Sequence, residues 1–188
     1  MEKPIESYWK VRLNDLRSTL DGNNFEAFVA DNKADARRIV LEEILPKLGP
    51  KTISWGGSMT FQVTGLYEAL KGMSGVEVLD TYDKSKPAEK VLELRRKALL
   101  VDLFITGTNA VTESGMLVNL DMIGNRVGAI TFGPRNVLIL VGRNKIVSDL
   151  YCEDCKAGDR ICNYWTITEK SYPKGRVKVV LINEDLGI

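Results

Sequence analysis

Two short runs of this sequence are almost entirely apolar, LFIT at residues 103–106 and NVLILVG at residues 136–142. Each has the length of a strand but lacks the polar–apolar alternation of a strand with one face in water. This pattern is typical of strands that are buried on both faces of a parallel sheet. Because helical periodicity alternates with such runs along the chain, we predict an open α/β sheet, mostly parallel and flanked by helices.

The first strand–helix units are predicted from residues 33–82. Residues 33–49 (KADARRIVLEEILPKLG) carry apolar side chains at helical spacing, with Asn32 as N-cap, and Pro46 and Gly49 should end or bend this helix. TISW then predicts a strand, GGS a turn, and the following residues a helix. The apolar stripe of that helix is predicted to be Met59, Val63, Leu66 and Leu70.

Further elements are predicted on either side of the two apolar runs. VEVLDTY (76–82) reads as a strand and PAEKVLELRRKALL (87–100) as a helix with Pro87 in its first turn. A helix is also predicted around residues 5–20. Near the C-terminus, NYWTITEK and RVKVVLINED flank the turn signal SYPKG, which predicts a terminal β-hairpin. The residues expected to face inward from the 87–100 helix are Val91, Leu94 and Ala98.

Composition limits the classes of function. The 188 residues suggest one domain, and 44% hydrophobic with 27% charged residues is ordinary for a soluble globular protein. A net charge of +1 gives no global field to recruit nucleic acid or an anionic membrane. No apolar run approaches the ~20 residues that span a bilayer, and the N-terminus lacks a signal-peptide core, so we expect a cytoplasmic protein. Histidine is absent, which leaves acid–base chemistry to Asp, Glu, Lys, Cys or Tyr.

The first candidate site is the loop WGGSMT. Ligands of open parallel sheets bind beyond the carboxyl ends of the strands, where loops lead into helices. Gly56 and Gly57 would let a ligand approach the backbone, and Ser58 and Thr60 would offer hydroxyls and amides to an anion. The alternative is a tight turn in which Ser58 only caps the helix.

Two more loops are predicted at the same edge. GTNAVTESG follows the buried strand DLFIT, and its Glu113 would accept a proton or act as a nucleophile, unless it is a solvated turn residue. Gly107, Thr108 and Asn109 begin this loop. The loop VGRNKIV follows NVLILVG and carries Arg143 and Lys145, which either face solvent or neutralise a phosphate or carboxylate.

The cysteines form a separate candidate site at residues 150–163. Cys152 and Cys155 have the C-x2-C spacing that can place two thiolates on one Zn or Fe ion or on an Fe–S cluster, and Cys162 would be a third ligand. The local sequence supplies no fourth cysteine, so Asp154, water or another chain would complete the set. A redox pair and free thiols are the alternatives.

The run DLFITGTNAVTESGMLVNLDMIGNRVGAITFGPRNVLILVGRNKIV, followed by CEDCKAGDRICN, resembles the lactate-utilisation (LUD) domain family in its stand-alone form. The resemblance covers nearly the whole chain (1–188) and is strongest over about residues 101–165. It implies a fold similar to the NagB/RpiA/CoA-transferase group. It also implies a role in oxidising L-lactate to pyruvate, usually beside an iron–sulfur protein partner.

The wider fold group implies roles for particular residues. In the CoA transferases a glutamate in a Ser-Glu-Asn-Gly type motif attacks the thioester, and TESG places Glu113 at a similar point with different flanking residues. Sugar-phosphate isomerases have an Asp where this chain has Asn109. Asn125, Arg126 and Lys145 are compatible with an anion-binding cleft.

Three functions are therefore open from the sequence: a component of lactate oxidation that binds a small anionic metabolite, a CoA- or sugar-phosphate-type enzyme that uses Glu113 or Lys145, and a non-enzymatic metal-binding or assembly protein. The oligomeric state is left open, a homo-oligomer included.

Overall fold

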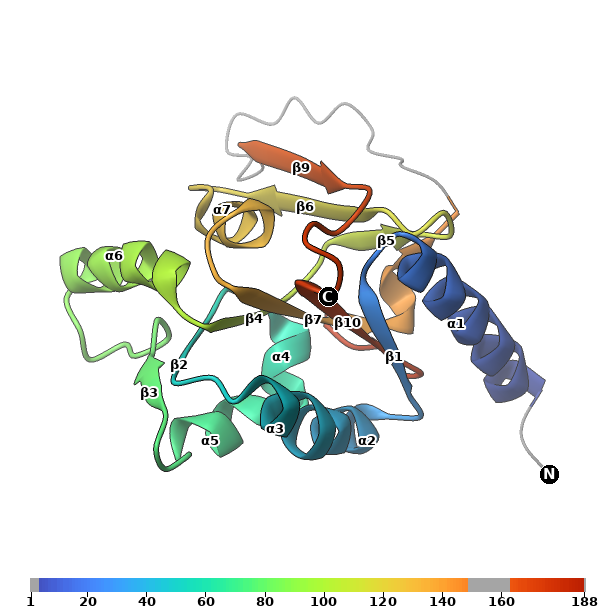
Figure 1. Ribbon diagram of the computed structural model, residues 1–188, viewed down its shortest axis with the longest axis horizontal. Helices are drawn as coiled ribbons and strands as arrows, with labels where there is room; N and C mark the ends of the chain where they lie inside the picture. The colour runs from blue at the N-terminus through green and yellow to red at the C-terminus, as the bar shows by residue number, and fades with distance from the viewer. Residues whose placement is uncertain (1–3, 149–162, 188) are drawn as a thin grey trace.

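The computed structural model describes residues 4–148 and 163–187, and its centre is a six-stranded sheet (Figure 1). All pairings in this sheet are parallel, in the order β1-β10-β7-β4-β2-β3. A smaller sheet, in the order β8-β5-β6-β9, forms a second layer. The strands of the large sheet are β1 (Glu26–Ala30), β2 (Thr52–Trp55), β3 (Glu77–Leu79), β4 (Leu103–Gly107), β7 (Asn136–Gly142) and β10 (Val177–Ile182). Those of the small sheet are β5 (Ala110–Thr112), β6 (Leu117–Asp121), β8 (Ile146–Val147) and β9 (Tyr164–Thr168).

Helices cover one face of the large sheet, while helices and the small sheet cover the other (Figure 1). The first face carries α2 (Lys33–Arg38), the π-helical segment η1 (Ile39–Ile44), α3 (Leu45–Leu48), α4 (Met59–Val63) and α5 (Leu66–Lys71). The opposite face carries α1 (Pro4–Gly22) and α7 (Asn125–Thr131). Beside the edge strand β3 lies α6 (Ala88–Lys97), and the short 3-10 turns are η2 (Ala98–Leu100) and η3 (Arg143–Lys145).

The two apolar runs are central strands, as predicted. Every residue of β4 is buried, and so is every residue of β7 except its first, because each strand has packed side chains on both faces. The neighbouring strand β10 is likewise buried along its full length. The predicted α/β architecture with a mostly parallel sheet is therefore confirmed.

The helix predicted over residues 33–49 forms with its expected ends. The side chain of Asn32 accepts hydrogen bonds from the amides of Ala34 (2.9 Å) and Asp35 (3.0 Å), and Gly49 ends the helix in the left-handed conformation at φ 52°. Pro46 does not end it. The π-helical segment η1 precedes this proline, and there the Leu45 amide donates to the carbonyl of Val40, five residues back.

Two packing predictions for the helices need correction. Met59 and Val63 are 54% and 43% exposed, and Thr60 and Phe61 are buried in their place. The reason is that the predicted single helix breaks at Gly65, which has φ 71°, so α4 and α5 are separate short helices. On α6, Val91 and Leu94 are only partly buried because this helix lies at the edge of the sheet, while Ala98 in η2 is buried.

The predicted C-terminal hairpin is wrong. β9 pairs antiparallel with β6 in the small sheet, from Leu117↔Thr168 to Asp121↔Tyr164. β10 lies parallel between β1 and β7 in the large sheet, so the SYPKG connection carries the chain from one layer to the other. The apolar run of β10 fits a doubly buried strand, whereas a hairpin would have left one of its faces in water.

Candidate functional site

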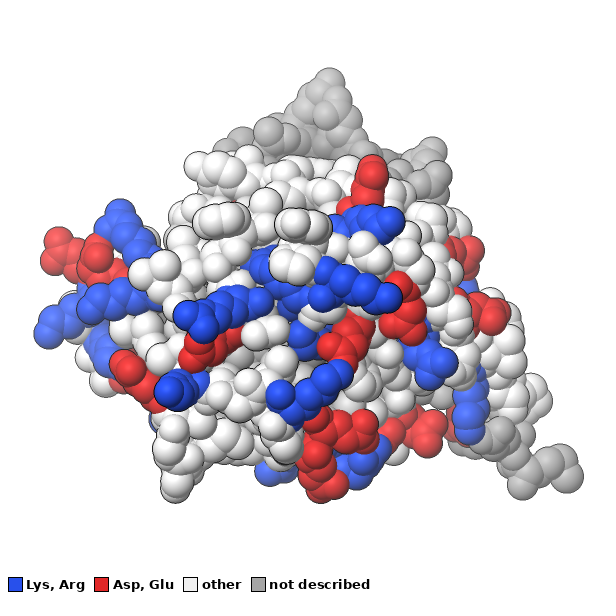
Figure 2. Space-filling view, viewed as in Figure 1, with Lys and Arg blue, Asp and Glu red and all other residues white. Residues whose placement is uncertain are grey.

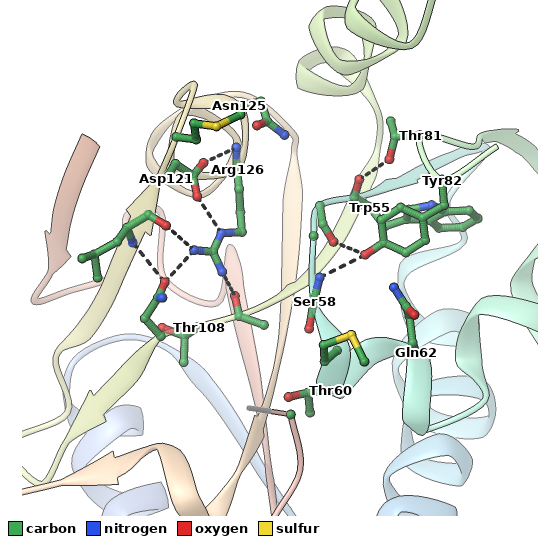
Figure 3. A pocket seen from close by; sticks show the side chains of 18 of the residues that line it. Trp55, Ser58, Thr60, Gln62, Thr81, Tyr82, Thr108, Asp121, Asn125 and Arg126 are labelled. Atoms are coloured by element: carbon green, nitrogen blue, oxygen red, sulfur yellow. Dashed lines mark hydrogen bonds and ion pairs between the residues drawn. The ribbon is translucent and has the colours of Figure 1, made fainter. Parts of the chain in front are cut away.

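A cavity of about 570 Å³ lies where the loops after β2, β4 and β7 meet the start of α7 (Figure 3). This is the carboxyl edge of the parallel strands, where open α/β sheets bind their ligands. Of the residues predicted to bind a ligand, Arg143 does not line it and is paired instead with Asp185 at 3.0 Å. The others all line it, which the sequence could suggest only loop by loop. These residues are Gly56, Gly57, Ser58, Thr60, Gly107, Thr108, Asn109, Asn125, Arg126 and Lys145.

Ser58 and Tyr82 hold the GGS loop on one wall of the cavity (Figure 3). The Ser58 hydroxyl oxygen accepts a hydrogen bond from the Phe61 amide at 3.1 Å, so Ser58 is the N-cap of α4. The Tyr82 hydroxyl donates to the Gly56 carbonyl at 2.5 Å and accepts from the Ser58 amide at 3.0 Å. The cap alternative is therefore realised, and the Ser58 amide is already bonded within the protein.

The glycines of the cavity have different roles. A Cβ on Gly56 would lie 2.9 Å from the Phe104 ring, and one on Gly107 would lie 2.6 Å from the Ser58 hydroxyl, so both positions require close backbone approach. A Cβ on Gly57 would meet nothing within 4 Å. Gly57 is thus the position at which a side chain can be added without disturbing the wall.

Four packed aromatic rings, of which Trp55 and Phe61 are buried, support this wall from behind. The Trp55 ring lies 5.5 Å from Phe61, 5.2 Å from Tyr67 and 6.2 Å from Tyr82. Asp80 joins three of these residues: it accepts hydrogen bonds from the Trp55 indole N–H (3.2 Å), the Tyr67 hydroxyl (3.0 Å) and the Tyr82 amide (2.9 Å). Burial raises the pKa of the Tyr82 hydroxyl, which therefore stays a neutral donor at neutral pH.

Arg126 and Asp121 form the opposite wall (Figure 3). Their side chains are 12% and 8% exposed, and the Arg126 Nε lies 2.9 Å from Asp121 Oδ1. Asp121 also accepts hydrogen bonds from the Arg126 and Val127 amides at 2.7 and 2.9 Å, which caps α7. The guanidinium further donates to Asn109 Oδ1 at 2.6 Å and the Leu120 carbonyl at 2.8 Å. The guanidinium also donates to the Gly107 carbonyl of β4 at 3.4 Å. Arg126 is thus neutralised by Asp121 and joins β4, β6 and α7, so it offers no free charge.

Sequence reasoning did not single out Tyr82, Gln62, Arg95 or Asp121, although all four line the cavity. Tyr82 and Asp121 were detectable in principle, because each lies near the end of a strand. Tyr82 follows β3 of the parallel sheet by three residues, and Asp121 is the last residue of β6. Arg95 had no such signal, since it lies near the end of α6 among three consecutive basic residues.

Glu113 lies apart from this lining. It occupies the turn between β5 and β6, where it forms an ion pair with Arg12 of α1, and its side chain is 49% exposed. The stretch GTNAVTESG therefore has two structural roles. Its first three residues line the cavity, and its later residues join two strands of the small sheet.

The cysteine prediction concerns Cys152, Cys155 and Cys162, which lie outside the described residues. Within residues 4–148 and 163–187 no group of three or more His, Cys, Asp or Glu side chains is arranged to hold a metal ion. In that same part of the chain, no helix has the length and apolar character required to cross a membrane.

A parallel sheet with a polar, partly cationic cavity at its carboxyl edge defines an α/β protein with a candidate ligand site. The model of the LUD domain family matches residues 13–153, which is more than half of the chain, and the protein belongs to this family. A solved structure with a similar fold is that of a DUF162 family protein from Deinococcus radiodurans, with a TM-score of 0.53 and 15% sequence identity. That alignment covers 93% of this chain and 98% of the other. The search of curated proteins found no match.

Proposed function

We propose that this LUD-domain protein is a component of L-lactate utilisation that binds a small organic anion in the cavity of Figure 3. One observation carries the proposal: the separate polar loops predicted from the sequence meet around one cavity that contains unpaired cations. These cations are Arg95 and Lys145, which form no ion pair with any residue that the structure describes, whereas Arg126 is paired with Asp121. Carboxylates are the natural partners of such groups. The cytoplasm as location and an iron–sulfur protein as partner belong to the same proposal.

The chemistry of the lining favours binding over proton transfer by this chain alone. Among the described lining residues the one carboxylate is Asp121, and its oxygens are bonded to Arg126 and to the α7 amides. Removing a proton or hydride equivalent from a hydroxy acid requires a base or an acceptor. Lys145 lines the cavity and is able to act as a base, whereas the acceptor would come from a partner, which agrees with the role of a component in a larger system.

Gly57 offers the cleanest test. We expect L-lactate or pyruvate to bind with an affinity measurable by calorimetry, and Gly57→Val to weaken binding at least tenfold, because Gly57 lines the cavity and the added side chain would occupy open space beside it. Gly22→Val is the matched control, since a Cβ at Gly22 also meets nothing within 4 Å and this residue ends α1 away from the cavity lining. Equal affinities in both variants, with unchanged melting temperatures, would show that the ligand does not bind in this cavity.

The CoA- or sugar-phosphate-type alternative depends on Glu113 or Lys145 as a reacting group. Lys145 lines the cavity, but Glu113 lies outside its lining and is paired with Arg12. A nucleophile has to reach the bound substrate, so the position of Glu113 gives this alternative no geometric support. The metal-binding alternative depends on cysteines outside the described residues.

A further inference from the structure

The charges of the cavity are unevenly compensated. Its lining contains three cationic side chains, Arg95, Arg126 and Lys145. Arg126 is neutralised by Asp121 at 2.9 Å and surrounded by further acceptors. Arg95 and Lys145 form no ion pair and no side-chain hydrogen bond with any residue that the structure describes. An anion entering the cavity therefore meets two cations with free hydrogen-bonding capacity.

These two cations reach the cavity from different parts of the sheet. Lys145 lies in η3, directly after β7, whereas Arg95 lies in α6, which follows the edge strand β3. In the sheet order β7-β4-β2-β3, three inter-strand steps separate the two starting strands. Strands lie about 4.8 Å apart, so β7 and β3 themselves lie about 14 Å apart across the sheet. The two cations therefore enter one lining from separate elements, and a ligand with two acidic groups would offer a partner to each.

The space between them suits a connecting chain. Neutral polar side chains, such as Ser58, Gln62 and Thr108, line the cavity, together with the apolar side chains of Met59, Met122 and Ile123, which are 42–54% exposed. At about 570 Å³ the cavity has the size of sites that take ligands of many non-hydrogen atoms, whereas lactate has six. A three-carbon acid would leave most of it to water.

A second depression continues the cavity beyond Arg95. The two share Gln62, Thr81, Tyr82 and Arg95, and the second adds Lys84 and Lys86 together with the carboxylates of Glu68 and Asp83. Lys86 is paired with Asp83 at 3.0 Å. The path from Lys145 therefore does not end in a closed wall at Arg95, and a ligand of several connected atoms can lie along it.

We propose that the cavity takes an elongated organic dianion, with one acidic group at Lys145 and the other at Arg95, joined by a weakly polar chain. This inference rests on the proposed function, because it assumes the same anion cavity and specifies its ligand. It specifies that the compound bound by the protein within lactate utilisation is longer than lactate itself.

Calorimetry with α,ω-dicarboxylates from malonate to suberate tests the inference. Each dicarboxylate is compared with the monocarboxylate of equal chain length. The dicarboxylates should bind at least tenfold more tightly than their monocarboxylate partners at the best length, and that best length should exceed three carbons. Equal affinity for both series would overturn the dianion and leave the anion cavity standing. Binding of neither series, nor of a terminal phosphate analogue of the same length, would overturn the cavity as well.

Variants locate the two acidic groups. Arg95→Gln and Lys145→Gln should each abolish the advantage of the dicarboxylate while changing monocarboxylate affinity much less, and Arg95→Lys should restore part of it. Lys90→Gln is the matched control, because Lys90 is an exposed cation of the same helix that is absent from the lining. An advantage that persists in both glutamine variants would show that other groups bind the second acid.

Discussion

The two walls of the cavity are held by different interactions (Figure 3). On the Ser58 side, a cluster of packed aromatic rings supports the loop, and Tyr82 adds two hydrogen bonds at its surface. On the Arg126 side, one buried ion pair joins two strands and the start of a helix. Packing is distributed over many contacts, whereas an ion pair fails as a unit when one partner is lost. The walls should therefore respond differently to single substitutions.

Charges of both signs are mixed on the molecular surface. Lys and Arg side chains on the face shown in Figure 2 lie beside Asp and Glu, so the charges there are mixed. The net charge of +1 agrees with this mixture. With so small a net charge, the unpaired cations of the cavity act on a ligand mainly at short range.

The largest expected effect is at Asp121. Asp121→Ala leaves the Arg126 guanidinium buried without its counter-charge and removes the acceptor of two α7 amides. We expect the free energy of unfolding in urea to fall by about 3–5 kcal/mol. Glu93→Ala, which removes an exposed pair with Arg96, is the control and should change it by less than about 1 kcal/mol. Similar effects for the two variants would mean that the Arg126 wall is not held by its ion pair.

A smaller effect is expected on the aromatic wall. Tyr82→Phe keeps the ring in its packing but leaves the Gly56 carbonyl and the Ser58 amide without their shared partner. The free energy of unfolding should fall by about 1–3 kcal/mol. Ligand affinity should fall as well, because the GGS loop loses its fixed position. A loss as large as that of Asp121→Ala would contradict the distinction between the two walls.

The same hydroxyl gives the aromatic wall a dependence on alkaline pH. Burial raises the pKa of Tyr82 in the folded protein above its value of about 10 in an unfolded chain. Below pH 10 the hydroxyl is protonated in both states; above it the unfolded chain releases the proton first, so stability is lost as pH rises through the folded-state pKa. The stability difference between the wild type and Tyr82→Phe should therefore shrink from pH 9 to pH 11 in urea unfolding curves. A constant difference would mean that Tyr82 ionises alike in both states.

The sequence predicted the large sheet better than the small one for a physical reason. Central parallel strands such as β4 and β7 are apolar on both faces, and that composition is visible locally. The partner of β9 lies in β6, more than forty residues earlier in the chain, and no local pattern specifies such a pairing. The β10 run had the composition of a central strand, yet its turn-like neighbour SYPKG favoured a hairpin interpretation.

The loops that line the cavity could be predicted one by one, but the bonding between their side chains could not. GGS, GTN and GRNK could be placed at one edge because parallel strands end there together. The neutralisation of Arg126 by Asp121 depends on β6 and α7 coming together in three dimensions, so the sequence could not show that this cation is already paired. The position of Glu113 likewise depends on the small sheet, which was not predicted.

The smallest effect is expected at Glu113, whose pair with Arg12 lies outside both walls. Its side chain is 49% exposed, and surface ion pairs of this kind contribute about 0–1 kcal/mol. Glu113→Gln should therefore lower the free energy of unfolding by less than about 1 kcal/mol and leave ligand affinity unchanged. Turnover in a reconstituted lactate-oxidising system should stay within about threefold, which corresponds to about 0.7 kcal/mol of barrier. Loss of turnover with intact binding would instead identify Glu113 as a reacting group, and the site would then have to extend from the cavity to the β5–β6 turn.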